Sequence, residues 1–177
     1  MKGYSVKGAG HRAPRKHHVP VVSEIKFPPG VLVAYTDGST YRSNPGPIGW
    51  AVLFVRDNDE EMNPVTFCVP WQLVGAHEHG SSSRAELMGV VWALEHAPHE
   101  DLVIRCDSLA TVNACLGLFH PRRNLDLWQR FHTVVNNRKR HGLSTHFEHV
   151  RGHYQDHYNK RVDRLAAEHL RDSAASQ

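Results

Sequence analysis

The hydrophobic pattern of this 177-residue chain changes its period near residue 80. Before that point, apolar residues form short runs, many of them β-branched: VLVAYT (31–36), WAVLFV (50–55) and VTFCVPWQL near 65–73. Such runs, separated by turns, predict three successive strands. Pro70 places the third strand at a sheet edge, because proline cannot donate to a ladder.

Beyond residue 80, helical spacing alternates with short apolar runs. One helical face carries Leu87, Val90, Val91, Leu94 and Ala97, and Pro98 ends that helix. LVIRC (102–106) and THFEHV (145–150) predict two further strands. Three further helices are expected. One runs from the segment after Asp107 to about Phe119, a second ends at Gly142 as its C-cap, and a third lies at the C-terminus. The pattern predicts an α/β fold in which helices cover a mixed sheet.

Length and composition indicate one domain with a real core, since 40% of the residues are apolar. We expect a flexible basic leader over 1–29, a catalytic domain over 30–173 and a disordered tail over 174–177. No apolar run exceeds about six residues, which excludes a membrane span, and no secretory signal is visible. Three cysteines without a C-x-x-C pair are typical of a reducing cytoplasm, so we expect a cytoplasmic protein.

The net charge of +3 conceals an uneven distribution. Residues 1–27 hold six Lys and Arg against one acid, residues 56–110 hold three against ten, and residues 111–177 hold eleven against six. An acidic middle between basic flanks favours a polyanionic partner held near a cation-binding centre. A mixed solvated surface is the alternative that charge alone leaves open.

Four carboxylates lie where a functional site would need them. Asp37 and Asp107 each follow an apolar strand, and strand ends in α/β sheets are where ligand-binding groups gather. Glu86 opens the first long helix, and Asp163 lies in the last helix beside Val162. Converging carboxylates repel one another unless divalent cations neutralise them, and oxygen ligands favour Mg²⁺ or Mn²⁺.

Each acid also has a purely structural interpretation. Asp37 suits a turn and Asp107 suits a helix N-cap. Glu86 completes an S-x-x-E capping box with Ser83, and Asp163 is spaced to pair with neighbouring bases on a solvated helix face. The four acids together, in strand–turn–helix order, favour the functional interpretation.

Five collinear segments resemble type 1 ribonuclease H. They are YTDGSTYRSNPGPIGWA, SSSRAELMGVVWAL, IRCDS, NLDLWQR and VRGHYQDHYNKRVDRLA, which together cover about residues 31–172. The resemblance implies an RNase H-like fold, whose five-stranded mixed sheet has its second strand antiparallel to its neighbours. It also implies an endoribonuclease that hydrolyses the RNA strand of RNA–DNA hybrids with two Mg²⁺ ions, leaving 5′-phosphate and 3′-hydroxyl ends. Mn²⁺ is a substitute cofactor.

The resemblance also implies roles for individual residues. Asp37, Glu86, Asp107 and Asp163 would be the catalytic metal ligands, and His153, ten residues before Asp163, would assist proton transfer or product release. Substrate contacts would come from Asn44, Ser81, Ser39, Arg84, Asn159 and Trp128. Trp128 would lie beside the channel for the DNA strand, although a helix tryptophan is as often part of a core.

The chain departs from the family pattern at three places. One extra residue separates Asp37 from Asn44, and Leu109-Ala110 stands where many members have Gln-Tyr. Only HPRRN (120–124) joins the third helix to the second, so the basic handle of longer bacterial enzymes is missing. Arg122, Arg123, the cluster 138–140 and the leader are candidates to replace its phosphate contacts.

Three other interpretations remain open at this stage. They are an inactive binding module on the same fold, a different metal nuclease such as a resolvase or proofreading exonuclease, and a metal protein using His77, His79 and Cys68. We expect a monomer without membrane contact. Cellular or viral origin, base preference and any partner in replication or reverse transcription are left open.

Overall fold

Five strands form one mixed sheet in the order β3-β2-β1-β4-β5. The computed structural model describes residues 30–56, 65–69, 80–151 and 156–175, and the structural statements that follow concern these residues. β1 (Leu32–Thr40) pairs antiparallel with β2 (Ile48–Arg56), which pairs antiparallel with β3 (Val65–Val69). β4 (Leu102–Cys106) and β5 (Thr145–His149) run parallel to β1. The expected antiparallel second strand and the edge position of the third strand are confirmed, whereas Pro70 lies outside the described residues.

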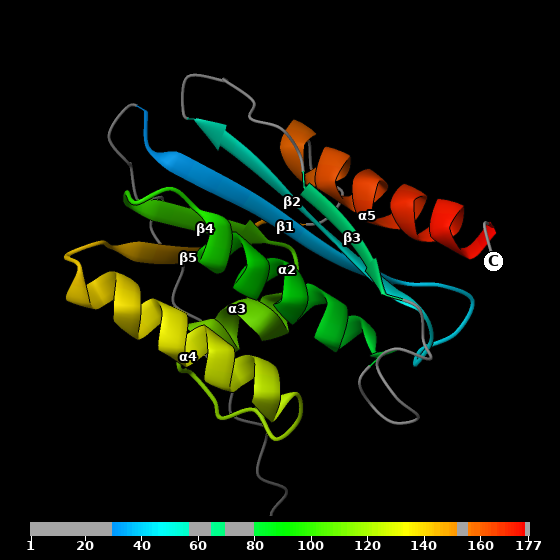
Figure 1. Ribbon diagram of the computed structural model, residues 1–177, viewed down its shortest axis with the longest axis horizontal. Coiled ribbons are helices and arrows are strands. Elements are labelled where there is room, and N and C mark those ends of the chain that lie inside the picture. Colours follow the sequence, from blue (N-terminus) through cyan, green and yellow to red (C-terminus); the bar gives the residue numbers. More distant parts are fainter. Residues whose placement is uncertain (1–29, 57–64, 70–79, 152–155, 176–177) are drawn as a thin grey trace, which may run out of the picture.

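Helices cover both faces of this sheet (Figure 1). α2 (Ser82–His96), α3 (Leu109–Cys115) and α4 (Leu125–Arg140) lie on one face, and α5 (His157–Ala175) lies on the other. β1 is therefore covered on both sides, which explains why its first six residues are all buried rather than alternating.

The period-2 geometry of β1 divides its side chains between two apolar clusters. Leu32 and Ala34 pack with α2 and α4, whereas Val33 and Tyr35 pack with α5 residues Val162 and Ala166. Each helix layer is thus attached to the central strand by apolar contact, and the end of that strand becomes the meeting point of the two layers.

Two helix boundaries differ from the sequence prediction. α3 ends at Cys115 instead of about Phe119, and Gly117 follows with a φ of +72°, a conformation that glycine adopts without strain. α5 continues to Ala175, so it includes the first two residues of the predicted tail. The predictions for 1–29 and 176–177 fall outside the described residues.

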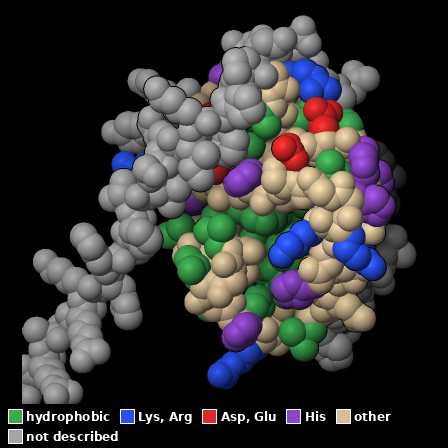
Figure 2. Space-filling view, turned by 90° about the vertical axis from the view of Figure 1, so that its left-hand side faces the viewer, with side chains coloured by type: hydrophobic (Ala, Val, Ile, Leu, Met, Phe, Trp, Pro, Cys, Tyr) green, Lys and Arg blue, Asp and Glu red, His purple; other side chains and the backbone are tan. Residues whose placement is uncertain are grey.

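The end of the sheet at which β1 begins shows scattered Lys, Arg and His side chains with a few acidic ones (Figure 2). The last turn of α4, Arg138 to Arg140, lies toward this end, because Arg138 donates a 2.6 Å hydrogen bond to the carbonyl of Glu100, just before β4 begins. In the part of the chain that the structure describes, no helix has the length and apolar character needed to cross a membrane.

Candidate active site

The register of two parallel strands brings Asp37 and Asp107 together. Thr36 of β1 pairs with Cys106 of β4, and the two aspartates are the next residues along each strand. The prediction that Asp107 follows its strand is correct. Asp37, however, lies inside β1, which continues to Thr40 paired with β2, and Asp37 itself pairs with Ala51. Its carboxylate is therefore 6% exposed instead of lying in a solvated turn.

Glu86 is brought to these aspartates by a close approach between α2 and β1. A Cβ added to Gly38 would overlap the backbone of Glu86 and Ala85, so only glycine permits this approach. Gly89, one turn along α2, is also near the strand: its added Cβ would lie 3.3 Å from the Cβ of Thr36. Glycine at two places along this interface lets the helix lie directly on the strand that carries Asp37.

The residues that cap α2 and α3 show that neither Glu86 nor Asp107 serves as a capping residue. Ser81, not Ser83, is the N-cap of α2, and its hydroxyl accepts a 3.3 Å hydrogen bond from the Arg84 amide. The predicted capping box of Ser83 with Glu86 is therefore wrong, since Glu86 lies a full turn into the helix. Likewise Ser108, not Asp107, caps α3. Both carboxylates are thus available to the cluster at the strand ends.

The electrostatics of the four acids show that they converge. Burial, followed by the charges of Asp107 and Asp163, raises the pKa of Asp37 to about 7. Burial and the charges of Asp37 and Asp107 raise the pKa of Glu86 well above its ordinary value. Asp163, which α5 presents as an exposed side chain, therefore faces the same centre from the opposite side of the sheet.

This donor set fits hard divalent cations. Ligand atoms of Glu86, Cys106 and Asp107 all lie within 4.8 Å of one another, and Asp37 adds a buried carboxylate beside them. Carboxylates whose pKa values are raised by mutual repulsion gain most from a cation, which neutralises them without a proton. Oxygen donors dominate the cluster, and they favour Mg²⁺ or Mn²⁺ over zinc.

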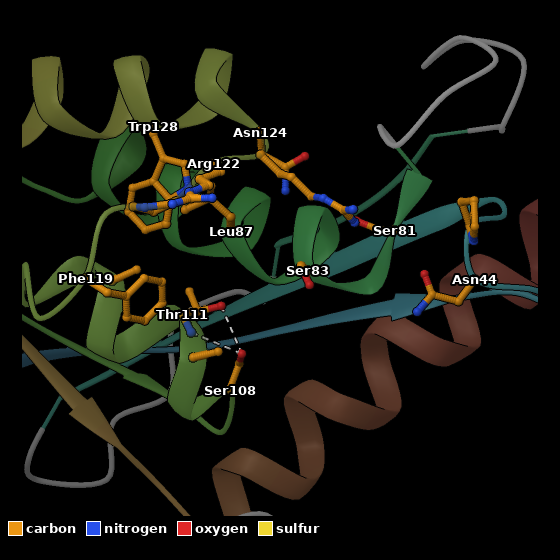
Figure 3. Close-up of a pocket in the computed structure, with 15 residues that line it drawn as sticks. Asn44, Ser81, Ser83, Leu87, Ser108, Thr111, Phe119, Arg122, Asn124 and Trp128 are labelled. Atoms are coloured by element: carbon orange, nitrogen blue, oxygen red, sulfur yellow. Dashed lines mark hydrogen bonds between the residues drawn. The ribbon is translucent and has the colours of Figure 1, made fainter. Parts of the chain in front are cut away.

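A cavity of about 530 Å³ is lined by the start of α2, by α3 and by the segment that leads into α4 (Figure 3). Its lining includes Ser108, the neighbour of Asp107, and Arg122 and Arg123 of the HPRRN segment. Three of the predicted substrate contacts also line it: Asn44, Ser81 and Trp128. Trp128 belongs to the core as well, because it is 8% exposed and packs edge-on against Phe131 with ring centroids 5.2 Å apart.

Asn44 is held in place by hydrogen bonds to the start of α2. Its Nδ2 donates to the Ser82 hydroxyl at 3.0 Å, and its Oδ1 accepts from the Ser82 amide at 3.1 Å. The β1–β2 turn is thereby attached to the helix that carries Glu86, despite the extra residue in that turn.

The remaining predicted substrate contacts do not line the cavity. Ser39 lies in β1 opposite Gly49, half-buried. The guanidinium of Arg84 makes a two-point ion pair with Asp126 of α4, at 2.9 and 2.6 Å. Asn159 is buried in the first turn of α5, one turn before Asp163, and among the described residues its Oδ1 has no hydrogen-bond partner.

His153 and the residues of the histidine-based alternative cannot be placed. His153, His77 and His79 lie outside the described residues, and of Cys68 only the backbone position in β3 is described.

Sequence reasoning missed Cys106 and Gly38. The Cys106 thiol, fully buried, donates a 3.5 Å hydrogen bond to Oε2 of Glu86. Its position directly before Asp107 was the available signal, but the contact depends on how α2 packs on the sheet. Gly38 follows Asp37 directly, and a glycine inside a strand is itself a sign of close backbone approach.

Comparisons with known proteins agree with this architecture. The RNase H family model matches residues 29–171. A ribonuclease H from Rhodopseudomonas palustris (strain HaA2) is 29% identical over 167 residues, covering 86% of this chain and 93% of the relative. A ribonuclease H from Ruegeria sp. (strain TM1040) is 32% identical over 149 residues, covering 76% of this chain and 88% of the relative.

Solved structures share the fold. LC11-RNase H1 in complex with RNA/DNA hybrid matches with a TM-score of 0.64 at 20% identity, over 81% of this chain and 99% of that one. RNase H1 from Halobacterium salinarum NRC-1 matches with a TM-score of 0.62 at 24% identity and the same coverage. The family match, on a mixed sheet whose central strands carry gathered carboxylates, identifies the protein as a nuclease. The chain belongs to the ribonuclease H family.

Proposed function

We propose that this protein is an endoribonuclease that hydrolyses the RNA strand of RNA–DNA hybrids, leaving 5′-phosphate and 3′-hydroxyl ends. The observation that carries the proposal is the convergence of Asp37, Glu86, Asp107 and Asp163 in a chain of this family. Relatives named ribonuclease H support the reaction, as does the fold neighbour bound to a hybrid.

In this proposal the four acids hold two Mg²⁺ ions, and Mn²⁺ can replace them. When bound, such ions supply a nucleophile from water at neutral pH and stabilise the leaving oxygen of an in-line displacement. Asp37 contributes a buried carboxylate from β1 and Glu86 a half-buried one from α2, and Asp107 and Asp163 approach from the end of β4 and from α5. His153 would accept or donate the proton in transit, from the segment before α5.

The cavity beside Ser108 is the proposed seat of substrate contacts. Arg122 and Arg123 supply cationic groups at its wall, and we propose that they replace the phosphate contacts of the absent handle. The cluster 138–140 is a weaker candidate. Arg138 is 7% exposed and donates to Thr145 and to the carbonyl of Glu100, so its guanidinium serves the fold.

The basic leader is proposed to add sequence-independent phosphate contacts from outside the catalytic domain, which we place at 30–173. Its net charge of +5 over residues 1–27 carries this suggestion. We propose that the protein acts as a monomer on its hybrid.

The proposed function is tested with three labelled duplexes of one sequence: an RNA–DNA hybrid, a DNA duplex and an RNA duplex, each with and without Mg²⁺. Cleavage of the hybrid's RNA strand alone, dependent on Mg²⁺ and giving 3′-hydroxyl ends, is expected. Equal cleavage of the DNA duplex would favour a different metal nuclease, and metal-dependent binding without cleavage would favour the inactive module.

A further inference from the structure

Three polar side chains lie side by side on neighbouring strands, two residues before the aspartates of the acid cluster. Tyr35 of β1 is in register with Arg105 of β4, which is in register with Glu148 of β5. Tyr35 precedes Asp37 by two residues, and Arg105 precedes Asp107 by two. Because side chains alternate along a strand, each pair lies on the same face of the sheet. We call these three side chains the polar row.

Hydrogen bonds connect the polar row from end to end. Arg105 donates from Nε to Glu148 at 2.9 Å and from Nη1 to the hydroxyl of Tyr35 at 2.8 Å. The ion pair is partly shielded, with side-chain exposures of 30% for Arg105 and 18% for Glu148. The row therefore ends at the hydroxyl of Tyr35, a residue that is only 4% exposed.

At its Tyr35 end, the polar row contacts the N-terminal turn of α5. Tyr35 packs against Tyr158 in the first turn of the helix, with ring centroids 5.4 Å apart, and the carboxylate of Asp156, the residue before the helix, lies close enough to act on the Tyr35 hydroxyl. Arg105 already donates to the Tyr35 oxygen, so the hydroxyl has its own proton left to donate, and the Asp156 carboxylate is the acceptor nearest in charge and position. Asp156 in turn accepts the amides of Tyr158 and Asn159 at 3.0 and 3.1 Å, as an N-cap does.

Apolar packing alone would leave the orientation of α5 loosely determined. Val162 and Ala166 anchor the helix against β1 and β2, but hydrophobic contact is non-directional. A hydrogen bond prescribes both distance and direction. Asn159 and Asp163 share one face of α5, so a rotation of the helix would move both relative to Asp37.

We propose that Tyr35 is a positioning residue that fixes the N-terminal turn of α5, and thereby the approach of Asp163 to the other three acids. The polar row and Asp156 form the connection, and Tyr35 is the point where sheet and helix join. The inference rests on the proposed function only in assigning Asp163 to the metal site.

The first test uses Tyr35→Phe, which removes the hydroxyl and keeps the ring beside Tyr158, whose centroid is 5.4 Å away. Amide hydrogen exchange at Tyr158 and Asn159 should accelerate about three- to tenfold, as loss of one hydrogen bond implies. The Mg²⁺ concentration at half-saturation, measured by calorimetry, should rise by a similar factor. In hybrid cleavage, kcat should fall with KM within about twofold, because a metal ligand is displaced and not a substrate contact.

Two matched controls separate positioning from stability. Tyr41→Phe removes a tyrosine hydroxyl from the β1–β2 turn, and Glu100→Gln breaks the Arg56–Glu100 ion pair at the opposite end of the sheet. Neither should change Mg²⁺ affinity or α5 exchange, whatever its effect on the melting temperature. Unchanged Mg²⁺ affinity and exchange in Tyr35→Phe would overturn the proposal.

A second variant keeps the test decisive if Tyr35→Phe does not fold. Asp156→Asn preserves a capping side chain but weakens the acceptor for Tyr35, and it should reproduce the loss of Mg²⁺ affinity. Where both variants fold, the double variant should be no worse than the more severe single one, and additive effects would refute the connection. If the wild type cleaves no hybrid, the proposed function fails, while exchange and calorimetry still decide the role of Tyr35.

Discussion

Gly38 of β1 is in direct backbone contact with Glu86 of α2, closer than any side chain at position 38 would allow. The contact joins the strand that carries the buried Asp37 to the helix that carries the half-buried Glu86. It fixes how far apart the backbones that carry Asp37 and Glu86 lie, and so keeps the two carboxylates within reach of one another.

Gly38→Ala should therefore damage stability and activity together. The added methyl must push α2 away from β1, and overpacking of this kind costs about 1–3 kcal/mol. Urea unfolding and hybrid cleavage measure the two losses. Gly89→Ala is the control, because its Cβ would need only a small shift of Thr36. An equally stable and active Gly38→Ala variant would contradict the contact.

Asp37→Asn should abolish cleavage and stabilise the metal-free protein. The pKa of Asp37 is about 7 in the fold against an ordinary 3.8, so folding takes up a proton between these values. Wild-type stability should fall as pH rises from about 4 to 7 and then level off, whereas the variant lacks this dependence. The advantage of the variant should reach on the order of 2–4 kcal/mol above pH 7 in EDTA.

Urea unfolding at pH 5 and pH 8, with and without Mg²⁺, measures this difference, and saturating Mg²⁺ should reverse it in favour of the wild type. Parallel pH profiles for the two proteins would contradict the raised pKa of Asp37. Cleavage by Asp37→Asn within tenfold of the wild type would reject the metal-ligand assignment.

Glu86→Gln should leave the fold intact and lower kcat by orders of magnitude. The amide matches the carboxylate in shape, and it removes a charge whose burial already raises the pKa of Glu86. The melting temperature in EDTA should be unchanged or higher. Glu95→Gln on the same helix, which breaks an exposed pair with Arg130, should retain full activity. Near-normal turnover by Glu86→Gln would remove this residue from the site.

Arg84 should act through Asp126 and not through substrate. Its guanidinium is committed to a two-point pair that joins α2 to α4, with the arginine side chain 12% exposed. Arg84→Gln and Asp126→Asn should lower the melting temperature by similar amounts, and the double variant should add little, with a coupling energy of about 0.5–3 kcal/mol. A change in the salt dependence of hybrid binding for Arg84→Gln alone would instead indicate a phosphate contact.

Arg122→Ala and Arg123→Ala should weaken hybrid binding mainly at low salt. Each lost phosphate contact lowers the slope of log affinity against log salt by about one. Lys139→Ala and Arg140→Ala, at the opposite end of the sheet, are controls that should leave the slope unchanged. Deleting residues 1–27 tests the leader in the same salt titration. If the deletion lowers the slope of log affinity against log salt and the Arg122 and Arg123 variants do not, the phosphate contacts belong to the leader.

The acids Asp37, Glu86 and Asp107 were predictable because local patterns place them. Each aspartate directly follows an apolar run: Asp107 follows the end of β4, whereas β1 continues past Asp37 to Thr40. A helical period beginning near residue 82 places Glu86 near the start of α2. The choice of Ser81 over Ser83 as N-cap was not predictable. Both serines have the same capping chemistry, and the close packing of α2 on Gly38 determines where the helix begins.

By itself, the sequence determined the order of strands and helices, the antiparallel second strand through its family resemblance, and the acids of the candidate site. Only the tertiary structure decided which side chains meet across long separations. The Arg84–Asp126 pair spans 42 positions and the Arg105–Tyr35 hydrogen bond spans 70. Hydrophobic periodicity specifies which face of an element is buried, whereas strand register and helix docking, which are set by packing of the whole chain, specify the partner on that face.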